Sequence, residues 1–240
     1  MKTKSIGIGL IILCGLISSC DHEIIRARGD ITTREVSFIG YSALKVSDPF
    51  NTYVQFSDTE EKIEIEANEN LHDKIIVELA DGTLRIRLKN HTSIRGNPTL
   101  NVYIVTKSIT DFDLSGASRL SLESELVASD VSIELSGASE FTGELDIHQL
   151  ELEGSGAAYV DLFGQVDKLD ASLSGASTLK NYDLSVKALD IRLSGASDAY
   201  LSVTETIDID ASGASKLRYK GSPIIVKSKL SGASEIIKKL

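Results

Sequence analysis

The chain has no tryptophan, and aromatic residues make up only 5% of its 240 residues. With so few aromatic side chains, the sequence shows no obvious exposed platform on which sugar rings would stack. Cysteine is scarce as well, because Cys14 and Cys20 are the only two and both lie near the N-terminus. If Cys14 leaves with a processed segment, no disulfide can form. The remaining domain then depends on its hydrophobic core, and about 220 residues are enough to build one.

Basic residues are also few relative to acidic ones. The chain has 25 Lys and Arg against 35 Asp and Glu, which gives a formal net charge of −10. Removal of Lys2 and Lys4 with an N-terminal signal would make the mature chain still more acidic. Tight binding to nucleic acid needs basic side chains gathered against the phosphates. The composition therefore excludes nucleic acid as a partner.

The N-terminal segment has the pattern of a secretory signal. Lys2 and Lys4 precede an apolar run over residues 6–17, and small residues follow it. The run is too short to cross a bilayer as a stable helix, although a retained anchor helix is the alternative interpretation. We assign residues 1–19 to a signal peptide.

The end of this segment, residues 16–20, reads Leu-Ile-Ser-Ser-Cys and resembles a bacterial lipobox. In a lipobox, small residues admit the signal peptidase and the cysteine thiol receives a diacylglyceryl group. Two or three acyl chains hold a protein on a membrane, whereas one chain is marginal. Cys20 is thus predicted to be lipidated, with residues 20–28 as lipidated cysteine and tether. Acidic Asp21 and Glu23 resemble surface-export signals, so we expect an outer-membrane lipoprotein of the cell envelope that faces the periplasm or the exterior.

A tetrapeptide, Ser-Gly-Ala-Ser, recurs seven times in the second half of the chain. Successive copies begin 21, 19, 19, 20, 18 and 19 residues apart, and only the third copy differs, with Ala158 as its last residue. A nearly fixed period of this length is typical of a solenoid, in which each repeat forms one turn. The copies begin at Ser115, Ser136, Ser155, Ser174, Ser194, Ser212 and Ser231.

Apolar and polar residues alternate on both sides of the motif. Val131, Ile133 and Leu135 stand five, three and one positions before the second copy, and Val160 and Leu162 follow the third. Alternation with period 2 is typical of β-strands that bury one face. Each repeat is therefore predicted to form strand, bend, strand and loop. Because 19 residues leave no room for a helical crossover, the repeats must stack on one another as a parallel β-helix.

The motif itself is predicted to be structural. Glycine adopts unusual backbone angles without steric cost, and the small side chains of serine and alanine can stack one strand spacing apart. A nucleophilic serine would need a neighbouring base and an oriented partner, yet His148 is the only histidine among the repeats. We predict that the motif glycines form a corner ladder of Gly116, Gly137, Gly156, Gly175, Gly195, Gly213 and Gly232.

Residues 29–240 are predicted to form one β-helix domain, with seven repeats over 109–240 and an irregular β-rich part over 29–108 that supplies early coils or a cap. Short alternating runs in the irregular part predict strands, separated by turn residues. Asp81-Gly82 has the composition of a hairpin turn, and residues 68–72 are predicted to form one helical turn. The expected strands lie at 36–38, 44–46, 53–56, 63–65, 76–79, 84–88 and 100–104.

Several segments together resemble a known family. They are Phe-Asn-Thr-Tyr-Val at 50–54, residues 63–71, Asp-Gly-Thr-Leu-Arg-Ile at 81–86 and the repeated Leu-Ser-Gly-Ala-Ser. In this order they resemble the putative auto-transporter adhesin, head GIN domain family. The resemblance implies a right-handed parallel β-helix like that of pectin lyases, on an exported lipoprotein with a proposed role in adhesion and without the lyase catalytic residues. Residues 29–31 match the family's N-terminal glycine signature only in degenerate form.

Acidic side chains occupy outward positions of the repeats. Glu151, Asp170, Asp190 and Asp208 stand four residues before successive motifs, so stacking would align them as a ladder. In water, carboxylates one strand spacing apart repel by roughly 0.9 kcal/mol per pair, which a bound cation would relieve. Calcium also prefers oxygens from turns, and the calcium-binding nonapeptide of β-rolls is missing. We treat the ladder as a candidate binding face and predict a solvated surface with no metal and no cofactor.

Two function classes remain open. The first is a non-enzymatic envelope or surface protein that binds an unidentified protein or polysaccharide with the faces of its solenoid. The second is a β-helical carbohydrate-active enzyme, a glycan hydrolase or lyase. General-acid catalysis needs one carboxyl of a pair with a raised pKa in a cleft, and the longest departures from the period, at 123–130 and 183–188, are where such a cleft would lie. Because short uniform loops leave little wall for a cleft, the first class is favoured.

Overall fold

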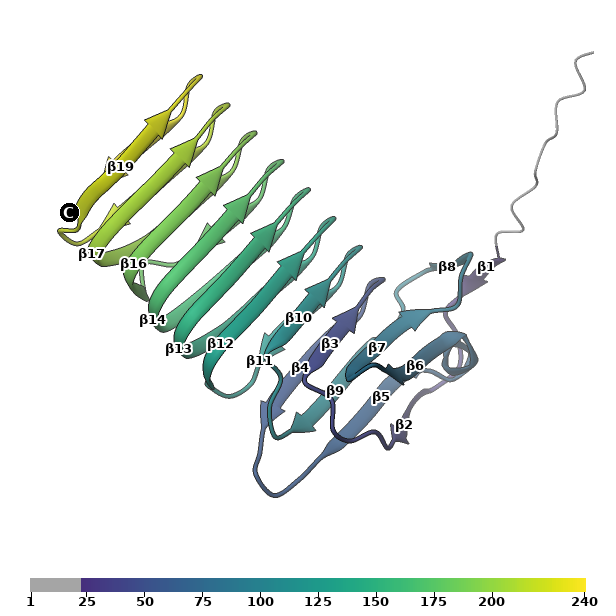
Figure 1. The fold of residues 1–240 in the computed structure, drawn as a ribbon. Coiled ribbons are helices and arrows are strands. Elements are labelled where there is room, and N and C mark those ends of the chain that lie inside the picture. The colour runs from purple at the N-terminus through teal and green to yellow at the C-terminus, as the bar shows by residue number, and fades with distance from the viewer. Residues whose placement is uncertain (1–22) are drawn as a thin grey trace, which may run out of the picture.

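The computed structural model describes residues 23–240, and Figure 1 shows them as a stack of coils closed at one end by a cap. The predicted signal peptide, residues 1–19, and the predicted lipidation site Cys20 lie outside the described residues. Both remain predictions. Nearly all regular structure is β, and the one helix is the 3-10 helix η1 (Glu69–Lys74).

The strands follow one another along the chain with short connections, except where the cap is inserted. They are β1 (Glu23–Arg26), β2 (Ile31–Val36), β3 (Ala43–Val46), β4 (Asn51–Phe56), β5 (Lys62–Asn68), β6 (Ile75–Ala80), β7 (Thr83–Leu88), β8 (Thr92–Arg95), β9 (Leu100–Thr106), β10 (Asp111–Leu114), β11 (Arg119–Leu122), β12 (Leu126–Leu135), β13 (Glu140–Gly154), β14 (Tyr159–Leu173), β15 (Thr178–Lys180), β16 (Leu184–Leu193), β17 (Asp198–Ala211), β18 (Lys216–Lys220), β19 (Ile224–Leu230) and β20 (Glu235–Lys238).

The predicted parallel β-helix is confirmed. Each repeat pairs in parallel with the next, as where β13 and β14 run together from Glu140 beside Tyr159 to Gly154 beside Leu173. Buried and outward residues alternate along these strands. The inward side chains join one continuous hydrophobic core that reaches from Tyr41 to Tyr219. Stacking therefore buries the apolar stripe that a single coil cannot bury alone.

The predicted loop of each repeat is wrong for three of the coils. β13, β14 and β17 run for 15, 15 and 14 residues without interruption. The chain turns the far edge of the solenoid by bending within a strand, so neighbouring coils stay hydrogen-bonded around that bend. We call this far edge the wide edge, and the edge formed by the Ser-Gly-Ala-Ser motifs the tight corner.

At the tight corner the motif glycines do lie in a ladder. All seven have positive φ, between 71° and 77°. A Cβ on Gly175 would lie 2.4 Å from the carbonyl oxygen of Gly156 in the preceding coil. That same oxygen accepts a hydrogen bond from the backbone N–H of Ala176, at 2.8 Å. Glycine is required at this position for two reasons: the positive φ, and the close approach of the neighbouring carbonyl oxygen.

The last residue of the motif is a buried serine in five of the seven copies, and it has a specific role. Ser177 is only 1% exposed, and its hydroxyl donates to the backbone carbonyl of Ser174 at 2.8 Å. The same bond from position four to position one recurs in the other complete copies. In the third copy Ala158 fills this position at 1% exposure and cannot donate. The fourth serine therefore pairs a carbonyl that the reversal of the chain leaves free.

The irregular N-terminal part contains a complete first coil that carries no Ser-Gly-Ala-Ser. β3 pairs in parallel with β10, and β4 pairs in parallel with β11. The corner between β3 and β4 reads Ser-Asp-Pro-Phe, with Asp48 at φ 68° beside Gly116 of the next coil. Aspartate tolerates this left-handed conformation better than most residues. Asp48 therefore takes the place of the motif glycine.

The chain leaves the first coil after β4 and builds the cap before it returns at β10 (Figure 1). β7 and β9 extend the two sheets in parallel beside β3 and β4. β6 then pairs antiparallel with β7, and β5 pairs antiparallel with both β9 and β2. The parallel stack thus ends in antiparallel strands, as the expected cap requires.

Local predictions in the cap had mixed outcomes. The hairpin at Asp81-Gly82 is confirmed, with both residues at positive φ between β6 and β7. The helical turn is also present, as η1. The strand expected at 36–38 is wrong, because β2 ends at Val36. The tether expected over 20–28 is too long, since Glu23–Arg26 forms β1 and pairs in parallel with β8 through all four of its residues.

Candidate binding faces

The outward side of the strands that precede the tight corner carries the acidic ladder. The register places Glu151 beside Asp170, Asp170 beside Asp190 and Asp190 beside Asp208. We call this side of the solenoid the acidic face. A second outward column lies two residues further along each strand and consists of Lys45, Asp113, Glu134, Glu153, Ser172, Arg192, Asp210 and Lys229.

Much of the charge on the acidic face is neutralised by neighbours. Arg192 leans out of the second column and lies 3.1 Å from Asp170 and 3.7 Å from Asp190. Lys227, the next residue of the first column, lies 3.3 Å from Asp208. Glu151 is exposed and, among residues 23–240, has no ion pair within 4.0 Å. Three of the four candidate carboxylates are therefore paired, which alignment along the column alone does not reveal.

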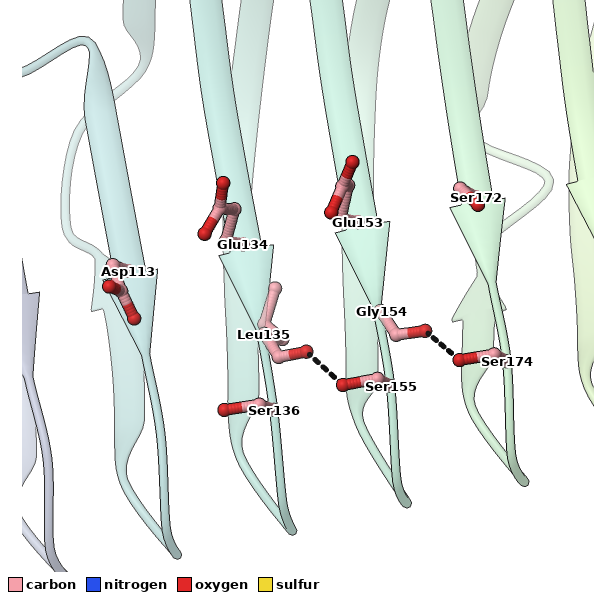
Figure 2. A pocket seen from close by; sticks show the side chains of 9 residues that line it. All are labelled: Asp113, Glu134, Leu135, Ser136, Glu153, Gly154, Ser155, Ser172 and Ser174. Atoms are coloured by element: carbon pink, nitrogen blue, oxygen red, sulfur yellow. Dashed lines mark hydrogen bonds between the residues drawn. The ribbon is translucent and has the colours of Figure 1, made fainter.

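A shallow groove runs along the acidic face next to the tight corner. Figure 2 shows it, with Glu134 and Glu153 on one side and the first serines of three motifs on the other. The hydroxyls of Ser155 and Ser174 donate to backbone carbonyls of the preceding coil, at 3.5 Å and 3.4 Å. On the inward side of the same strand, Gly154 leaves room in the core that the side chain of Leu173 fills, since a Cβ on Gly154 would lie 2.8 Å from Leu173 Cδ2.

The acidic face does not gather the ligands of a metal site. Within the described part of the chain, no group of three or more Asp, Glu, His or Cys side chains is placed to hold a metal ion. The carboxylates instead stand in columns on flat strands, without the turn oxygens that calcium prefers. The face therefore presents hydrogen-bond acceptors and residual negative charge to a partner.

The outward side of the strands that follow the tight corner holds a feature that sequence reasoning missed. Five of the seven tyrosines gather on it although they are scattered along the chain, and we call this side the tyrosine face. Tyr53 and Tyr103 stack with ring centroids 5.1 Å apart, and Tyr182 and Tyr200 meet edge to face at 6.0 Å. The five are Tyr53, Tyr103, Tyr159, Tyr182 and Tyr200.

The composition therefore gave no sign of this partly exposed aromatic cluster. Tyr103 belongs to β9 and Tyr53 to β4, and they meet only because the cap inserts β9 beside the first coil. Partial burial and the nearby carboxylate of Glu66 raise the pKa of the Tyr103 hydroxyl above its ordinary value. At the other end of the face, Arg218 lies 4.8 Å from the ring centroid of Tyr200 and covers it.

Two of the three histidines in residues 23–240 make side-chain contacts within the fold. His72 is buried, and its Nε2 lies 3.0 Å from both the hydroxyl and the carbonyl of Thr32. His148 is exposed and lies 3.0 Å from Asp167. Hydrogen bonds from Lys187 and then His148 lower the pKa of Asp167 below its ordinary value. A carboxyl with a lowered pKa is ionised at neutral pH and is a poor general acid.

The segments where a catalytic cleft was expected are mostly strand. Residues 123–130 lead into β12, and residues 183–188 lead into β16. A hollow does lie beside the first of them, lined by Phe56, Asp58, Lys107 and Glu125 among others. In the part of the chain with described positions, no helix is long and apolar enough to pass through a membrane.

These features define the chain as an all-β solenoid with a packed core and flat polar faces. The sequence matches the family "Putative auto-transporter adhesin, head GIN domain" over residues 40–223, and the chain belongs to this family. None of the curated proteins matches the sequence.

Several solved structures have the same fold. A putative adhesin from Bacteroides fragilis superimposes with a TM-score of 0.80 and 21% identity, covering 89% of this chain and 97% of its own. A putative adhesin from Parabacteroides merdae gives 0.73 and 17%, covering 91% and 100%. A putative lipid binding protein from Parabacteroides distasonis gives 0.73 and 20%, also covering 91% and 100%. At these identities the likeness concerns the fold.

Proposed function

We propose that the chain is a non-enzymatic lipoprotein of the bacterial cell envelope that holds its solenoid at the outer membrane as a binding or adhesion module. The observation that carries this proposal is the pair of flat outward faces, each made of aligned side chains from successive coils over one continuous core. A rigid face of this kind is preorganised, so a partner binds without ordering loops first. Membership of an adhesin family supports the same function.

Attachment through Cys20 is the second part of the proposal. The lipobox-like sequence at 16–20 supports it, and the described chain begins with β1 at the capped end of the stack (Figure 1). A tether at that end would leave both faces and the far coils available to a partner. The membrane would then be a partner only through the lipid.

Fractionation and adhesion together test the proposal. Cells that produce the chain should keep it in the membrane fraction, and Cys20→Ala should move it to the soluble fraction. Cells that display the wild-type chain should adhere to a glycan or protein array more strongly than cells with Cys20→Ala, whose protein is no longer held on the cell. Retention of Cys20→Ala in the membrane fraction would disprove the lipid anchor.

The enzyme alternative has its own test. The purified chain should release no product from a panel of neutral and acidic polysaccharides. Reproducible turnover that is lost when a single carboxylate is replaced, for example in Glu125→Gln beside the hollow at β12, would replace the binding function with a catalytic one.

A further inference from the structure

We propose that the tyrosine face binds a neutral glycan in the groove beside Tyr53. This inference rests on the proposed binding function and adds to it a site and a class of ligand. The groove lies across β4, β11 and β13, at the junction between the first coil and the repeats. Its outward lining residues are Asn51, Tyr53, Arg119, Ser121, Glu140 and Thr142.

One face of the Tyr53 ring is open toward this groove. In a parallel ladder, outward side chains at paired positions stand beside one another at about one strand spacing, ~4.8 Å. Tyr103 is paired with Tyr53 on one side and stacks on it, with 14° between the ring planes. Ser121 is paired with Tyr53 on the other side, and its side chain is too short to cover a ring. The second face of Tyr53 therefore forms a wall of the groove.

The floor of the groove is low because the next two positions of this column are small. Ser121 is followed by Thr142 in β13 and then by Asp161 in β14. On the far side, beyond Thr142, the hydroxyl of Tyr159 donates to Asp161 at 3.4 Å. A large aromatic wall, a polar floor and a polar far side make a site with an apolar surface and a few directed polar groups, as ligand sites generally have.

The aromatic wall is held in position by a polar network behind it. The hydroxyl of Tyr103 donates to Glu66 at 3.3 Å, and the amide of Asn101 donates to the same carboxylate at 2.7 Å. The amide of Asn51 donates in turn to Asn101 at 3.2 Å. With its partners fixed in this way, Tyr53 would lose little rotamer freedom on binding, which favours affinity.

The charges of the groove favour a neutral ligand that offers many hydroxyls. Arg119 and Glu140 face each other at 3.0 Å and are exposed, so together they supply donors and acceptors without net charge. Hydroxyls of a sugar can use both, while its C–H edges meet the electron-rich face of Tyr53. An acidic glycan would meet the carboxylate of Glu140 and a chain of net charge −10. Nucleic acid is disfavoured for the same reason.

A titration of the purified full chain in detergent micelles tests the proposal. The probes are cellohexaose, laminarihexaose and mannohexaose, with hexagalacturonate as the acidic comparison. Tyrosine fluorescence reports binding directly because the chain has no tryptophan, and saturation-transfer NMR identifies the sugar protons in contact. We expect at least one neutral hexasaccharide to bind with saturation of its ring C–H protons, and more tightly than hexagalacturonate.

Variants locate the site. Tyr53→Ala should weaken the dissociation constant at least tenfold, and Tyr53→Phe should stay within about twofold because the ring face is kept. Arg119→Met should weaken binding several-fold. Because the side chain of Arg119 is exposed, this substitution should not disturb folding. Tyr200→Ala, on the same face but outside the groove, is the matched control and should bind as wild type.

Three results would overturn the inference. These are binding of none of the neutral hexasaccharides, tighter binding of hexagalacturonate, or equal binding by Tyr53→Ala and wild type. None of these results would by itself disprove the proposed binding or adhesion function. A chain that loses the glycan site but still sits in the membrane and still mediates adhesion would need another partner, such as a protein.

Discussion

The tight corner and the wide edge of the solenoid make the same reversal of the chain in opposite ways. At the tight corner, seven coils turn through a four-residue motif whose glycine always has φ between 71° and 77°. At the wide edge the solutions differ from coil to coil. β13 and β17 bend within a strand, the coil between β15 and β16 turns through Asn181 at φ 140°, and that between β18 and β19 turns through Gly221 at φ 101°.

The difference shows what makes a repeat strict. At the tight corner the reversal is hydrogen-bonded to the preceding coil, where the carbonyl of the motif glycine accepts the N–H of the alanine in the next copy. There is no space for a Cβ at 2.4–2.7 Å from that oxygen. At the wide edge Gly164 and Gly221 approach the neighbouring coil as closely, because a Cβ on them would lie 2.2 Å and 2.1 Å from a carbonyl oxygen. The coil that precedes Gly164, however, has Leu145 at the paired position. A strict repeat therefore arises where every coil uses the same geometry, which holds at the tight corner and not at the wide edge.

The largest effect should come from a single methyl group at the tight corner, compared with the same change in the exposed hairpin of the cap. Gly175→Ala and Gly82→Ala introduce the same side chain at the same φ of +73°, but only the first meets backbone of a neighbouring coil. The left-handed conformation alone costs about 1–2 kcal/mol, and the overlap at Gly175 should add about 1–3 kcal/mol. Urea unfolding followed by circular dichroism measures both. Equal destabilisation would show that stacking does not explain the motif glycine.

A smaller effect is expected at the fourth motif position. Ser177→Ala removes the bond to the carbonyl of Ser174 and should cost about 1 kcal/mol, because Ala158 shows that the corner accommodates a methyl group. The reverse change, Ala158→Ser, should stabilise by up to a similar amount. Comparing the two unfolding midpoints checks the role of the hydroxyl, and a destabilising Ala158→Ser would contradict it.

Insertions in the last coils should destabilise the fold more at the tight corner than at the wide edge. A Gly-Ser dipeptide after Ser222, in the exposed turn of the wide edge, should cost less than about 1 kcal/mol, since lengthening a surface loop is cheap. The same dipeptide after Gly232 separates Ala233 from the carbonyl of Gly213 and should be clearly worse. Thermal melting of the two proteins measures the difference, and equal melting temperatures would remove the distinction.

The smallest effect concerns an exposed cluster close to the wide edge. Lys187 and His148 lower the pKa of Asp167, so Lys187→Met should raise that pKa toward the ordinary value of 3.8. Because the folded-state pKa lies below the unfolded one, the stabilisation is present above the unfolded pKa and is lost as the pH falls through the folded pKa. Titration of the Asp167 carboxyl carbon by NMR measures the shift. An unchanged pKa would show that the ion pair does not form in solution.

The sequence is most informative where the geometry is strictest. The motif glycines and the alternation around them were enough to predict parallel coils and the corner ladder. The first coil was not recognised as a repeat, because Asp48 holds the left-handed position without a glycine and proline follows it. The pairing of β1 with β8 also gave no signal, since both strands are only four residues long.

The faces were harder to predict than the core. Register within the repeats could be counted from the motif, so the alignment of Glu151, Asp170 and Asp190 followed from the sequence. The lean of Arg192 onto two of these carboxylates depends on a rotamer, which no spacing reveals. The stacking of Tyr53 on Tyr103 depends on the insertion of β9 beside β4, which pairs residues 50 positions apart in the sequence, and no motif marks this pairing.

The insertion of the cap between the first and second coils has a consequence for how the molecule assembles. Most coils meet a neighbour about one repeat away, as Arg192 meets Asp170 over 22 residues, whereas Lys45 meets Asp113 over 68. Closing the longer segment costs roughly 1 kcal/mol more in chain entropy. Repeat arrays can nucleate locally and propagate. We therefore expect the coils over 109–240 to fold early by pairing with one another in sequence. The pairing of β3 with β10 and of β4 with β11 should form late, after the intervening cap strands have folded.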